Sequence, residues 1–421
     1  MLLAHKFFRV VGGAEVFFFE TGRLLEESGH EVCYLSTAHQ ENKPSVFTPY
    51  FVDAHDYARG GLISRVGALN SAIYSRNAKS AARRLIHDFR PDVAHMFGIA
   101  THLSTSVVDA CADAGVPVVM SCNDYKHICP NYQLFHHGRI CEDCKGGRFY
   151  NAVRNRCCHD SVAFSAASML EAYSESARGS LRKRVDLFLF ASDFMANKTS
   201  EFWGDGSFSY QMLRNPFSAE RADNIGNGDY VIFFGRLTEE KGVAQLLEAA
   251  ALLPEVPFVI VGDGPCDLSL RAQAAEAGLQ NVEFLGPRWG KELQGVLGGA
   301  RLVVVPSMWH ENFPYVILQA FAAGKPVVGS DRGGIPELIG DSERGLVYAA
   351  DRPDLLADAV QQVWSATEER QVMGRRARAY VVDEYSEDSF LSSLMEAYGR
   401  VWHASSQLNR SEQASTEGKS Q

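Results

Sequence analysis

Short apolar runs alternate with glycine-containing turns and helical stretches along this chain, and that rhythm constrains the fold more than any other feature. In the second half of the sequence the strand-like runs are residues 230–234, 258–261, 282–284, 302–305 and 327–329, with helical spacing between them. Strands that alternate with helices form parallel sheets whose strands are joined by crossovers. The pattern therefore predicts an α/β fold.

The first half repeats the rhythm, with strand-like runs at residues 31–36, 91–96, 116–120 and 185–191. A chain of 421 residues is also too long for one ordinary domain of about 100–200 residues. We therefore expect two Rossmann-like, doubly wound domains that face each other across a cleft. Ligands of such sheets bind at the carboxyl ends of the strands.

Composition suggests where the parts begin and end. The first domain is expected at residues 1–215, with a Cys-rich insert at 127–160, and the second domain at 216–385. Apolar residues at helical spacing predict a C-terminal helix at 386–403, which we expect to pack back on the first domain. Residues 404–421 turn to Ser, Gln, Glu, Asn and Lys, a composition typical of a disordered tail.

Charge limits the classes of partner. The formal charge of −10, from 41 basic and 51 acidic residues, disfavours a nucleic-acid partner. No run approaches the roughly 20 apolar residues of a membrane-spanning helix, and the first residues lack the order of a signal peptide. We therefore expect a soluble, cytoplasmic protein that can associate with the inner face of the membrane.

The charge is also unevenly divided. Residues 1–216 hold 23 basic and 22 acidic residues, a sum of +1, whereas residues 217–421 hold 18 and 29, a sum of −11. One interpretation is two domains with independent surfaces. The other is a first domain that faces an anionic partner, such as a membrane surface or a phospholipid-bearing substrate.

A turn that carries two cations follows the run 230–234. Gly235 and Arg236 open this turn, and Lys241 closes it just before a helical stretch. The free N–H groups and the dipole of a helix N-terminus favour anions, while arginine adds a planar fork and lysine a point charge. The turn is a candidate anion site, although a surface turn with two solvated cations has the same pattern.

Two further segments follow predicted strands. Gly262 and Gly264 come after the run 258–261, where small residues let a ligand approach the backbone. Glu311 lies in the loop before an apolar helical stretch in which Gln319 is one of few polar residues. A buried polar group needs a partner, which here is either the backbone or a ligand hydroxyl.

Five stretches together carry a family resemblance. Residues 11–15, 235–242, 262–265, 311–328 and 330–337 resemble motifs of the nucleotide-sugar glycosyltransferases of family 4, the glycosyl transferases group 1. Members of that family are two-domain, retaining, metal-independent enzymes of the GT-B fold, and a subset carries a Cys-rich insert in the N-terminal domain. The resemblance extends over about residues 5–400.

The resemblance implies a function and a set of site residues. It implies a hexosyltransferase that moves a sugar from a UDP- or GDP-sugar to a glycan or lipid-linked acceptor, in cell-surface polysaccharide or lipopolysaccharide biosynthesis, without a catalytic cofactor. Arg236 and Lys241 would hold the donor diphosphate and neutralise the charge of the leaving group, and Glu311 would bind sugar hydroxyls. The implied donor-binding set is Gly12, Gly13, Gly235, Gly262, Gly264, Asn312, Phe313, Pro314 and Gln319.

Two residues depart from the family pattern. Gln319 stands where the family has a glutamate that contacts the donor ribose, and a neutral amide can still donate and accept there. Asn123 stands where relatives commonly have a histidine near the donor sugar. Asparagine does not shuttle protons, but a retaining front-face mechanism does not require a protein base. On the acceptor side the candidates are Asn123, Asp124 and His95.

These departures keep an alternative open, namely a non-catalytic GT-B protein that binds a nucleotide sugar. A second alternative comes from another class, a dinucleotide-dependent dehydrogenase on Rossmann sheets. No Gly-x-Gly-x-x-Gly follows the first predicted strand, which disfavours the dehydrogenase.

Five of the nine cysteines cluster in the insert, at Cys129, Cys141, Cys144, Cys157 and Cys158. A Cys-x2-Cys with flanking thiols fits a structural zinc site formed by Cys129, Cys141, Cys144 and Cys157. The same pattern is consistent with reduced, buried thiols, and a redox or metal-cluster role is a third interpretation. A reducing compartment disfavours disulfides. Because the insert follows a first-domain strand, we expect it to lie near the acceptor.

Overall fold

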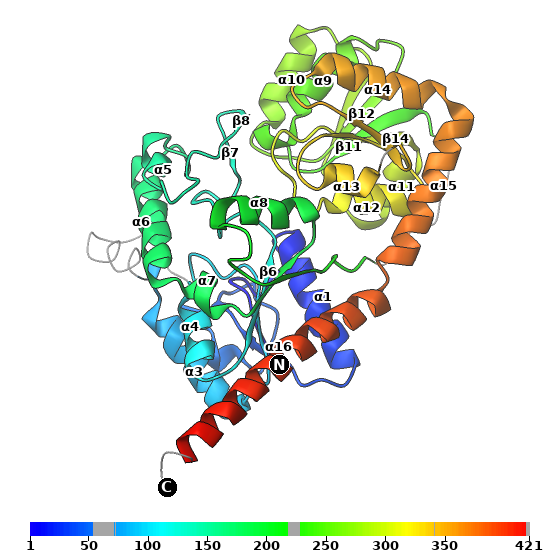
Figure 1. Ribbon diagram of the computed structural model, residues 1–421. Helices are drawn as coiled ribbons and strands as arrows, with labels where there is room; N and C mark the ends of the chain where they lie inside the picture. Colours follow the sequence, from blue (N-terminus) through cyan, green and yellow to red (C-terminus); the bar gives the residue numbers. More distant parts are fainter. Residues whose placement is uncertain (54–70, 72, 218–227, 341, 418–421) are drawn as a thin grey trace.

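Two α/β units form the molecule, each built on a six-stranded parallel sheet (Figure 1). The computed structural model describes residues 1–53, 71, 73–217, 228–340 and 342–417, with side chains as far as Gln407. The arrangement confirms the predicted α/β class with two doubly wound sheets.

The first sheet has the strand order β10-β9-β6-β5-β1-β2, with every neighbouring pair parallel. Its strands are β1 (Leu2–Ala4), β2 (Cys33–Leu35), β5 (Ala94–Met96), β6 (Val118–Cys122), β9 (Leu187–Phe190) and β10 (Tyr210–Met212). The helices of this domain are α1 (Gly13–Glu27), α3 (Arg76–Phe89), α4 (Ser106–Asp113), α6 (Val162–Arg178), α7 (Ser180–Arg184) and α8 (Asp193–Trp203). Shorter elements are β3 (Thr37–Ala38), η1 (Thr48–Tyr50) and β4 (Val52–Asp53), and the Cys-rich insert adds β7 (Phe135–His136), β8 (Arg139–Ile140) and α5 (Asn151–Arg154).

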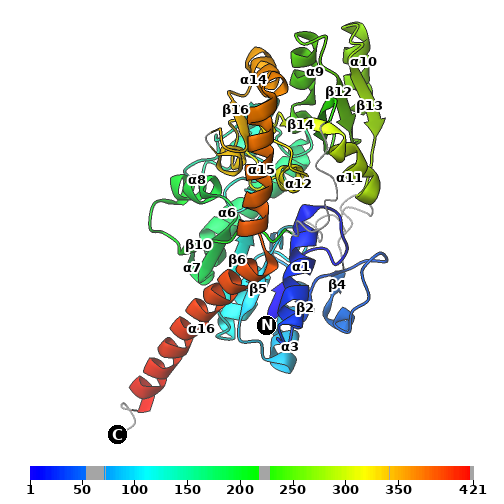
Figure 2. The same ribbon diagram turned by 90° about the vertical axis from the view of Figure 1, so that its right-hand side faces the viewer.

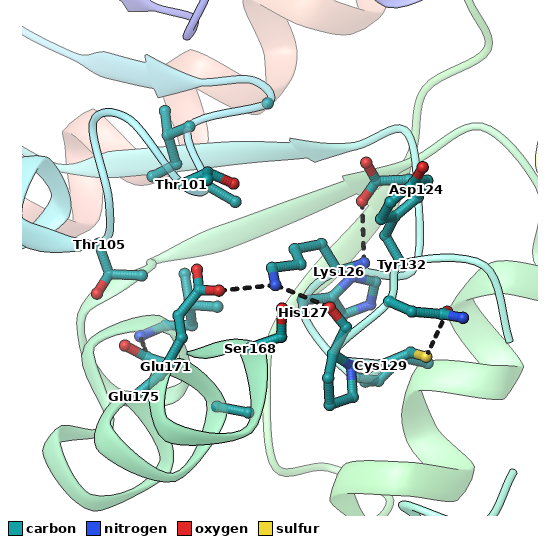
Figure 3. A pocket seen from close by; sticks show the side chains of 18 of the residues that line it. Thr101, Thr105, Asp124, Lys126, His127, Cys129, Tyr132, Ser168, Glu171 and Glu175 are labelled. Atoms are coloured by element: carbon teal, nitrogen blue, oxygen red, sulfur yellow. Dashed lines mark hydrogen bonds and ion pairs between the residues drawn. The ribbon is translucent and has the colours of Figure 1, made fainter. Parts of the chain in front are cut away.

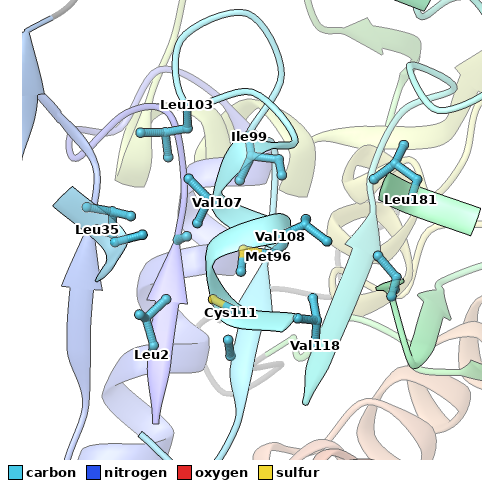
Figure 4. Close-up of a cluster of buried hydrophobic side chains, with 14 of the residues drawn as sticks. Leu2, Leu35, Met96, Ile99, Leu103, Val107, Val108, Cys111, Val118 and Leu181 are labelled. Carbon is cyan, nitrogen blue, oxygen red and sulfur yellow. The ribbon is translucent and has the colours of Figure 1, made fainter. Parts of the chain in front are cut away.

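A buried apolar cluster joins one face of the first sheet to α4 (Figure 4). Leu2, Met96 and Val118 come from three neighbouring strands, and Val107 and Cys111 from the helix. All five are fully buried or nearly so. Burial of such side chains stabilises each by about 1.5–3 kcal/mol, so this cluster holds α4 on the sheet.

The second sheet has the order β13-β12-β11-β14-β15-β16, again parallel throughout. Val231 and Phe233 of β11 face one core cluster and Ile232 and Phe234 the other, so the sheet is covered on both faces. Its strands are β11 (Tyr230–Phe234), β12 (Phe258–Val261), β13 (Val282–Gly286), β14 (Ala300–Val305), β15 (Val327–Ser330) and β16 (Gly345–Tyr348). The helices are η3 (Glu239–Lys241), α9 (Val243–Ala251), α10 (Asp267–Glu276), α11 (Gly290–Gly298), α12 (Tyr315–Ala322), α13 (Ile335–Ile339), α14 (Pro353–Ser365) and α15 (Thr367–Glu384).

The chain passes between the domains twice, at neighbouring positions. It leaves the first domain near Phe217 and returns after Tyr385, and the Phe217 N–H donates to the Tyr385 carbonyl at 3.0 Å. The returning segment is α16 (Glu387–Glu417), which runs away from α15 along the first domain (Figure 2). Its apolar side chains pack with Leu3, Phe17 and other buried residues of that domain.

The C-terminal segment differs from the predicted disordered tail at 404–421. Helix α16 continues to Glu417, and residues 418–421 lie outside the described residues. The segment from 404 to 417 contains neither glycine nor proline, and Ala, Leu, Gln, Arg and Glu are good helix formers. Extending an existing helix also avoids the cost of nucleation, so a polar composition alone did not end it.

Candidate functional site

Loops from both domains meet at the N-terminus of α12. Gly13, the first residue of α1, lies against the ring of Tyr315, and a Cβ on this glycine would be 3.5 Å from the tyrosine Cδ2. The Gly12 N–H donates to the Glu15 carboxylate at 2.7 Å, which holds the glycine loop onto its own helix. The two predicted donor-binding glycines of the first domain therefore border the loop that carries Glu311.

Three glycines allow the loops after β11 and β12 to touch. A Cβ on Gly262 would be 1.8 Å from the Gly235 carbonyl oxygen, and a Cβ on Gly264 would be 2.4 Å from that of Leu237. The Gly235 N–H donates to the Val261 carbonyl at 3.0 Å. Only glycine fits at 262 and 264, so glycine is needed at both positions for the two loops to pack against each other.

Lys241 and Glu311 form the central ion pair of the second domain. The Lys241 Nζ lies 2.6 Å from the Glu311 Oε1, and the Ser307 hydroxyl donates to the same oxygen at 2.7 Å. Glu311 is 6% exposed. Sequence reasoning predicted both charged residues and missed Ser307.

Glu311 stays ionised despite its burial. Burial acts to raise the pKa of Glu311, but the Lys241 charge and the hydrogen bonds from Lys241 and Ser307 hold it below its ordinary value. A buried carboxylate stays charged only where cations and hydrogen-bond donors surround it.

Backbone donors lie beside this pair. The N–H groups of Asn312 and Phe313 donate to no other described residue, and Pro314 occupies the N-cap position of α12. These N–H groups and the helix N-terminus can bind an anion or a sugar oxygen. Gln319 is half-buried on α12, and its side chain makes no hydrogen bond to a described residue.

Arg236 is placed differently from Lys241. Its side chain is 71% exposed, and its Nη2 lies 3.7 Å from the Glu240 Oε1. A long, exposed guanidinium with one weak partner remains available to a ligand.

The side chain of Asn312 ties the domains together. Its Nδ2 donates to the Cys122 carbonyl at 3.0 Å, and the Ser192 hydroxyl donates to its Oδ1 at 2.8 Å. Nearby, the Glu337 carboxylate accepts the Asp193 and Phe194 N–H groups at the start of α8, at 2.9 and 2.6 Å. We name these contacts of Asn312 and Glu337 the interdomain clasp. The sequence predicts a role for the Asn312 backbone only, and no local pattern in it indicates the clasp.

A cavity of about 1140 Å³ opens at the carboxyl ends of β1, β5 and β6 and extends between the insert and α6 (Figure 3). Asn123 and Asp124, two of the predicted acceptor-side candidates, line it, and the Asn123 Nδ2 is buried without a hydrogen-bond partner among the described residues. Deeper in the cavity Lys126 lies 2.7 Å from Glu171.

His5 is a cavity residue that sequence reasoning missed. It directly follows β1, is 1% exposed, and its Nε2 has no hydrogen-bond partner among the described residues. The same nitrogen lies 3.6 Å from the Glu15 carboxylate. Burial lowers the pKa of His5 to about 4, so the imidazole is neutral at pH 7. Its place at the end of a strand was the available signal.

The prediction that His95 contacts the acceptor is wrong. His95 is 1% exposed, and its two ring nitrogens lie 2.7 Å from the Tyr398 hydroxyl and 2.8 Å from the Ser121 hydroxyl. Alternation along β5 turns this side chain to the face of the sheet that α16 covers. His95 therefore joins the C-terminal helix to the first domain.

Buried histidines make the fold sensitive to acid. Burial lowers the pKa of His95 from 6.5 to about 3, so the unfolded chain binds a proton first and stability falls as pH drops below 6.5. One such group contributes about 1.4 kcal/mol per pH unit. We expect His95→Gln to flatten the decline in unfolding free energy between pH 6 and pH 4 by about that slope. His87→Gln, at a side chain that is 85% exposed, is the control. Equal slopes for both variants would contradict this role.

The Cys-rich insert holds five reduced cysteines. Among the described residues, which include all five, no group of three His, Cys, Asp or Glu side chains is placed to hold a metal ion. Cys129, Cys141, Cys144 and Cys157 nevertheless line one small cavity together, and the structural zinc site stays a prediction. Burial raises the pKa of Cys129, Cys141 and Cys144, which favours the neutral thiol. The hairpin turn at Gly138 approaches Glu239, where a Cβ would be 3.3 Å from the Oε1, so the insert reaches the second domain.

Two family models match the chain in succession. The model described as Glycosyltransferase Family 4 matches residues 11–206, and the one described as Glycosyl transferases group 1 matches residues 217–380. A D-inositol 3-phosphate glycosyltransferase of Corynebacterium urealyticum is 34% identical over 194 residues, which cover 43% of this chain and 45% of that protein. The chain spans about half the length of the curated relatives it matches.

Solved structures match over nearly the whole chain. Sucrose-phosphate synthase from Thermosynechococcus elongatus superposes with a TM-score of 0.69 at 15% identity, covering 96% of this chain and 99% of that one. Anabaena Alr3699/HepE in complex with UDP-glucose gives a TM-score of 0.64 at 18% identity, covering 95% and 99%. At these identities the likeness concerns the fold.

Proposed function

The chain belongs to glycosyltransferase family 4, the glycosyl transferases group 1, with the GT-B fold, and from that premise we propose that it is a retaining glycosyltransferase. It transfers a hexose-type sugar from a nucleoside diphosphate sugar, with UDP or GDP as the nucleotide, to a glycan or lipid-linked acceptor. The pathway we propose is the biosynthesis of a cell-surface polysaccharide or lipopolysaccharide. Catalysis requires no metal or other cofactor in this proposal.

The observation that carries the proposal is the Lys241–Glu311 pair beside the free N–H groups of Asn312 and Phe313. Cations and backbone donors suit a diphosphate, and a buried carboxylate suits sugar hydroxyls. Arg236 and Lys241 neutralise the departing diphosphate, and Glu311 orients the sugar. The departing phosphate accepts the proton of the acceptor hydroxyl, so neither Asn123 nor His5 needs to act as a base.

The alternative is a non-catalytic protein that binds a nucleotide sugar. Gln319 favours it, because a neutral amide stands where relatives have a carboxylate. Donor binding without any turnover would support this alternative, and turnover would exclude it.

The transfer is proposed to take place in the cytoplasm, at the inner face of the membrane. In the described part of the chain, no helix combines the length and apolar character that crossing a bilayer requires.

A donor panel tests the proposal. Purified protein is incubated with labelled UDP- and GDP-sugars and a membrane lipid extract, and transfer and binding are both measured. We expect one nucleotide sugar to be bound and its sugar moved to an extractable acceptor. Absence of both binding and transfer across the panel would refute the proposed function.

A further inference from the structure

Helix α6 has the opposite orientation of its polar and apolar faces to that of an ordinary surface helix. Its polar residues Ser168, Glu171 and Glu175 point into the first-domain cavity (Figure 3), and only Ser165 of its 17 residues is buried. Surface helices of a globular protein normally turn an apolar stripe towards the core. The polar stripe of α6 faces inwards instead.

The apolar stripe of α6 faces solvent. One helical turn takes about 3.6 residues, so residues three or four positions apart lie on the same face of the helix. Val162, Leu170 and Tyr173 on this face are 50%, 44% and 39% exposed. The whole stripe consists of Val162, Ala166, Met169, Leu170, Tyr173 and Ala177.

An aromatic residue of the insert extends this surface. Tyr150 is 52% exposed, and its N–H donates to the Tyr173 hydroxyl at 3.3 Å. Helix α5 begins directly after Tyr150 and contacts α6. The apolar surface therefore continues from α6 onto the insert, at the outer edge of the first domain in Figure 1.

Basic residues occupy the segments on either side of α6. The exposed side chains of Arg148, Arg154 and Arg156 lie in the insert beside α6, and those of Arg182 and Lys183 lie on α7 at its other end. None of the five forms an ion pair with a described residue, whereas Glu171 pairs inwards with Lys126. Residues 126–184 contain ten basic and five acidic residues. The second domain, by contrast, carries the negative charge of the chain.

We propose that α6 and α5 lie on an anionic membrane surface, with the apolar stripe inserted among the lipids and these basic residues at the headgroups. An amphipathic helix with an apolar stripe, tyrosines and flanking arginines is suited to the interfacial plane of a bilayer. Each basic residue near an anionic leaflet adds attraction. The proposal deepens the proposed membrane location, and its account of the acceptor rests on the proposed function, whereas vesicle binding is measured apart from transfer.

This orientation gives the cavity a role. With α6 on the bilayer, its polar face lines a cavity that begins beside the membrane and extends to Ala14 and Glu15 at the start of α1. The polar head of a lipid-linked acceptor can then enter the cavity while its hydrocarbon stays in the bilayer. A lipid-linked glycan is therefore the acceptor class that fits this surface.

The test measures co-sedimentation of the full chain with vesicles. The probes are vesicles of phosphatidylcholine with about one third phosphatidylglycerol, and vesicles of pure phosphatidylcholine. We expect the protein to pellet with the anionic vesicles only. Leu170→Glu with Tyr173→Glu should lower the bound fraction by about tenfold or more, because charge is expelled from the interface. Arg148→Glu with Arg154→Glu should weaken binding in the same direction.

The matched control is Leu252→Glu with Leu268→Glu, two leucines of the second domain that are 57% and 82% exposed. We expect this variant to pellet like the parent protein. Equal pelleting of the α6 variant and the control would overturn the proposal, as would failure of the parent protein to bind anionic vesicles. A parent dimer that Leu170→Glu dissociates, without vesicle binding, would also overturn it. Thermal unfolding verifies that each variant is folded, and donor binding is measured separately.

Discussion

We expect Lys241→Ala to lower kcat/KM by about 10²–10³-fold, because the substitution removes a cation that stabilises the charge developing on the leaving diphosphate. The lysine lies 2.6 Å from Glu311 and next to the free backbone donors at the start of α12. Turnover is measured with the nucleotide sugar that the donor panel identifies. Lys291→Ala, at an exposed lysine on α11, is the control and should leave turnover unchanged.

The single variant also leaves Glu311 without its counter-charge. An unpaired buried carboxylate destabilises a fold by about 3–5 kcal/mol, so a loss of activity alone would not separate catalysis from folding. Adding Glu311→Gln removes that charge. We expect the double variant to recover the Tm of the parent protein while its turnover stays low. Near-normal turnover in the folded double variant would show that the pair is structural only.

Gly262→Ala is expected to lower the free energy of unfolding by about 3 kcal/mol or more. Its Cβ would be 1.8 Å from the Gly235 carbonyl oxygen, and the residue has a φ of +141°, which alanine rarely adopts. The loops after β11 and β12 must separate to accept the methyl group. Donor binding should fall with stability, since Gly235 and Arg236 move with the loop.

Gly278→Ala is the matched control for this prediction. Gly278 also has a positive φ, of +65°, but a Cβ there would have nothing within 4 Å. It therefore carries the backbone cost without the clash. We expect a loss of about 1 kcal/mol, the typical cost of a left-handed alanine. Urea unfolding compares the variants, and equal losses would refute a packing role for Gly262.

The sequence predicted most of the strands that are buried on both faces, but it did not predict β1, whose three residues form too short an apolar run. The central strands β11 and β12 coincide with the predicted runs, because a fully apolar run between turns has few other uses. The edge strand β10 was missed, since its residues Tyr210 and Gln211 are only partly buried or exposed. Helix α6 was missed for a different reason. Its apolar stripe faces away from the core, so the spacing of its apolar residues did not predict a helix packed on the core.

The site was predictable where its residues are close in sequence. Arg236 and Lys241 follow one strand, and Glu311 follows another at the same edge of the sheet. The clasp between Asn312 and Cys122 depends on how two domains meet, which no local pattern records. The prediction for His95 was wrong for the same reason, because its partner Tyr398 lies 303 residues away in the chain.

The Lys241–Glu311 pair also bears on product exit. A nucleoside diphosphate that pairs with Lys241 leaves the buried Glu311 carboxylate without its counter-charge and without the hydroxyls of the transferred sugar. An intact nucleotide sugar supplies both partners at once. Once the sugar has gone, the glutamate competes with the spent diphosphate for the same lysine. Under the proposed function, the pair would therefore favour release of the nucleoside diphosphate and binding of a new nucleotide sugar. This competition would limit product inhibition.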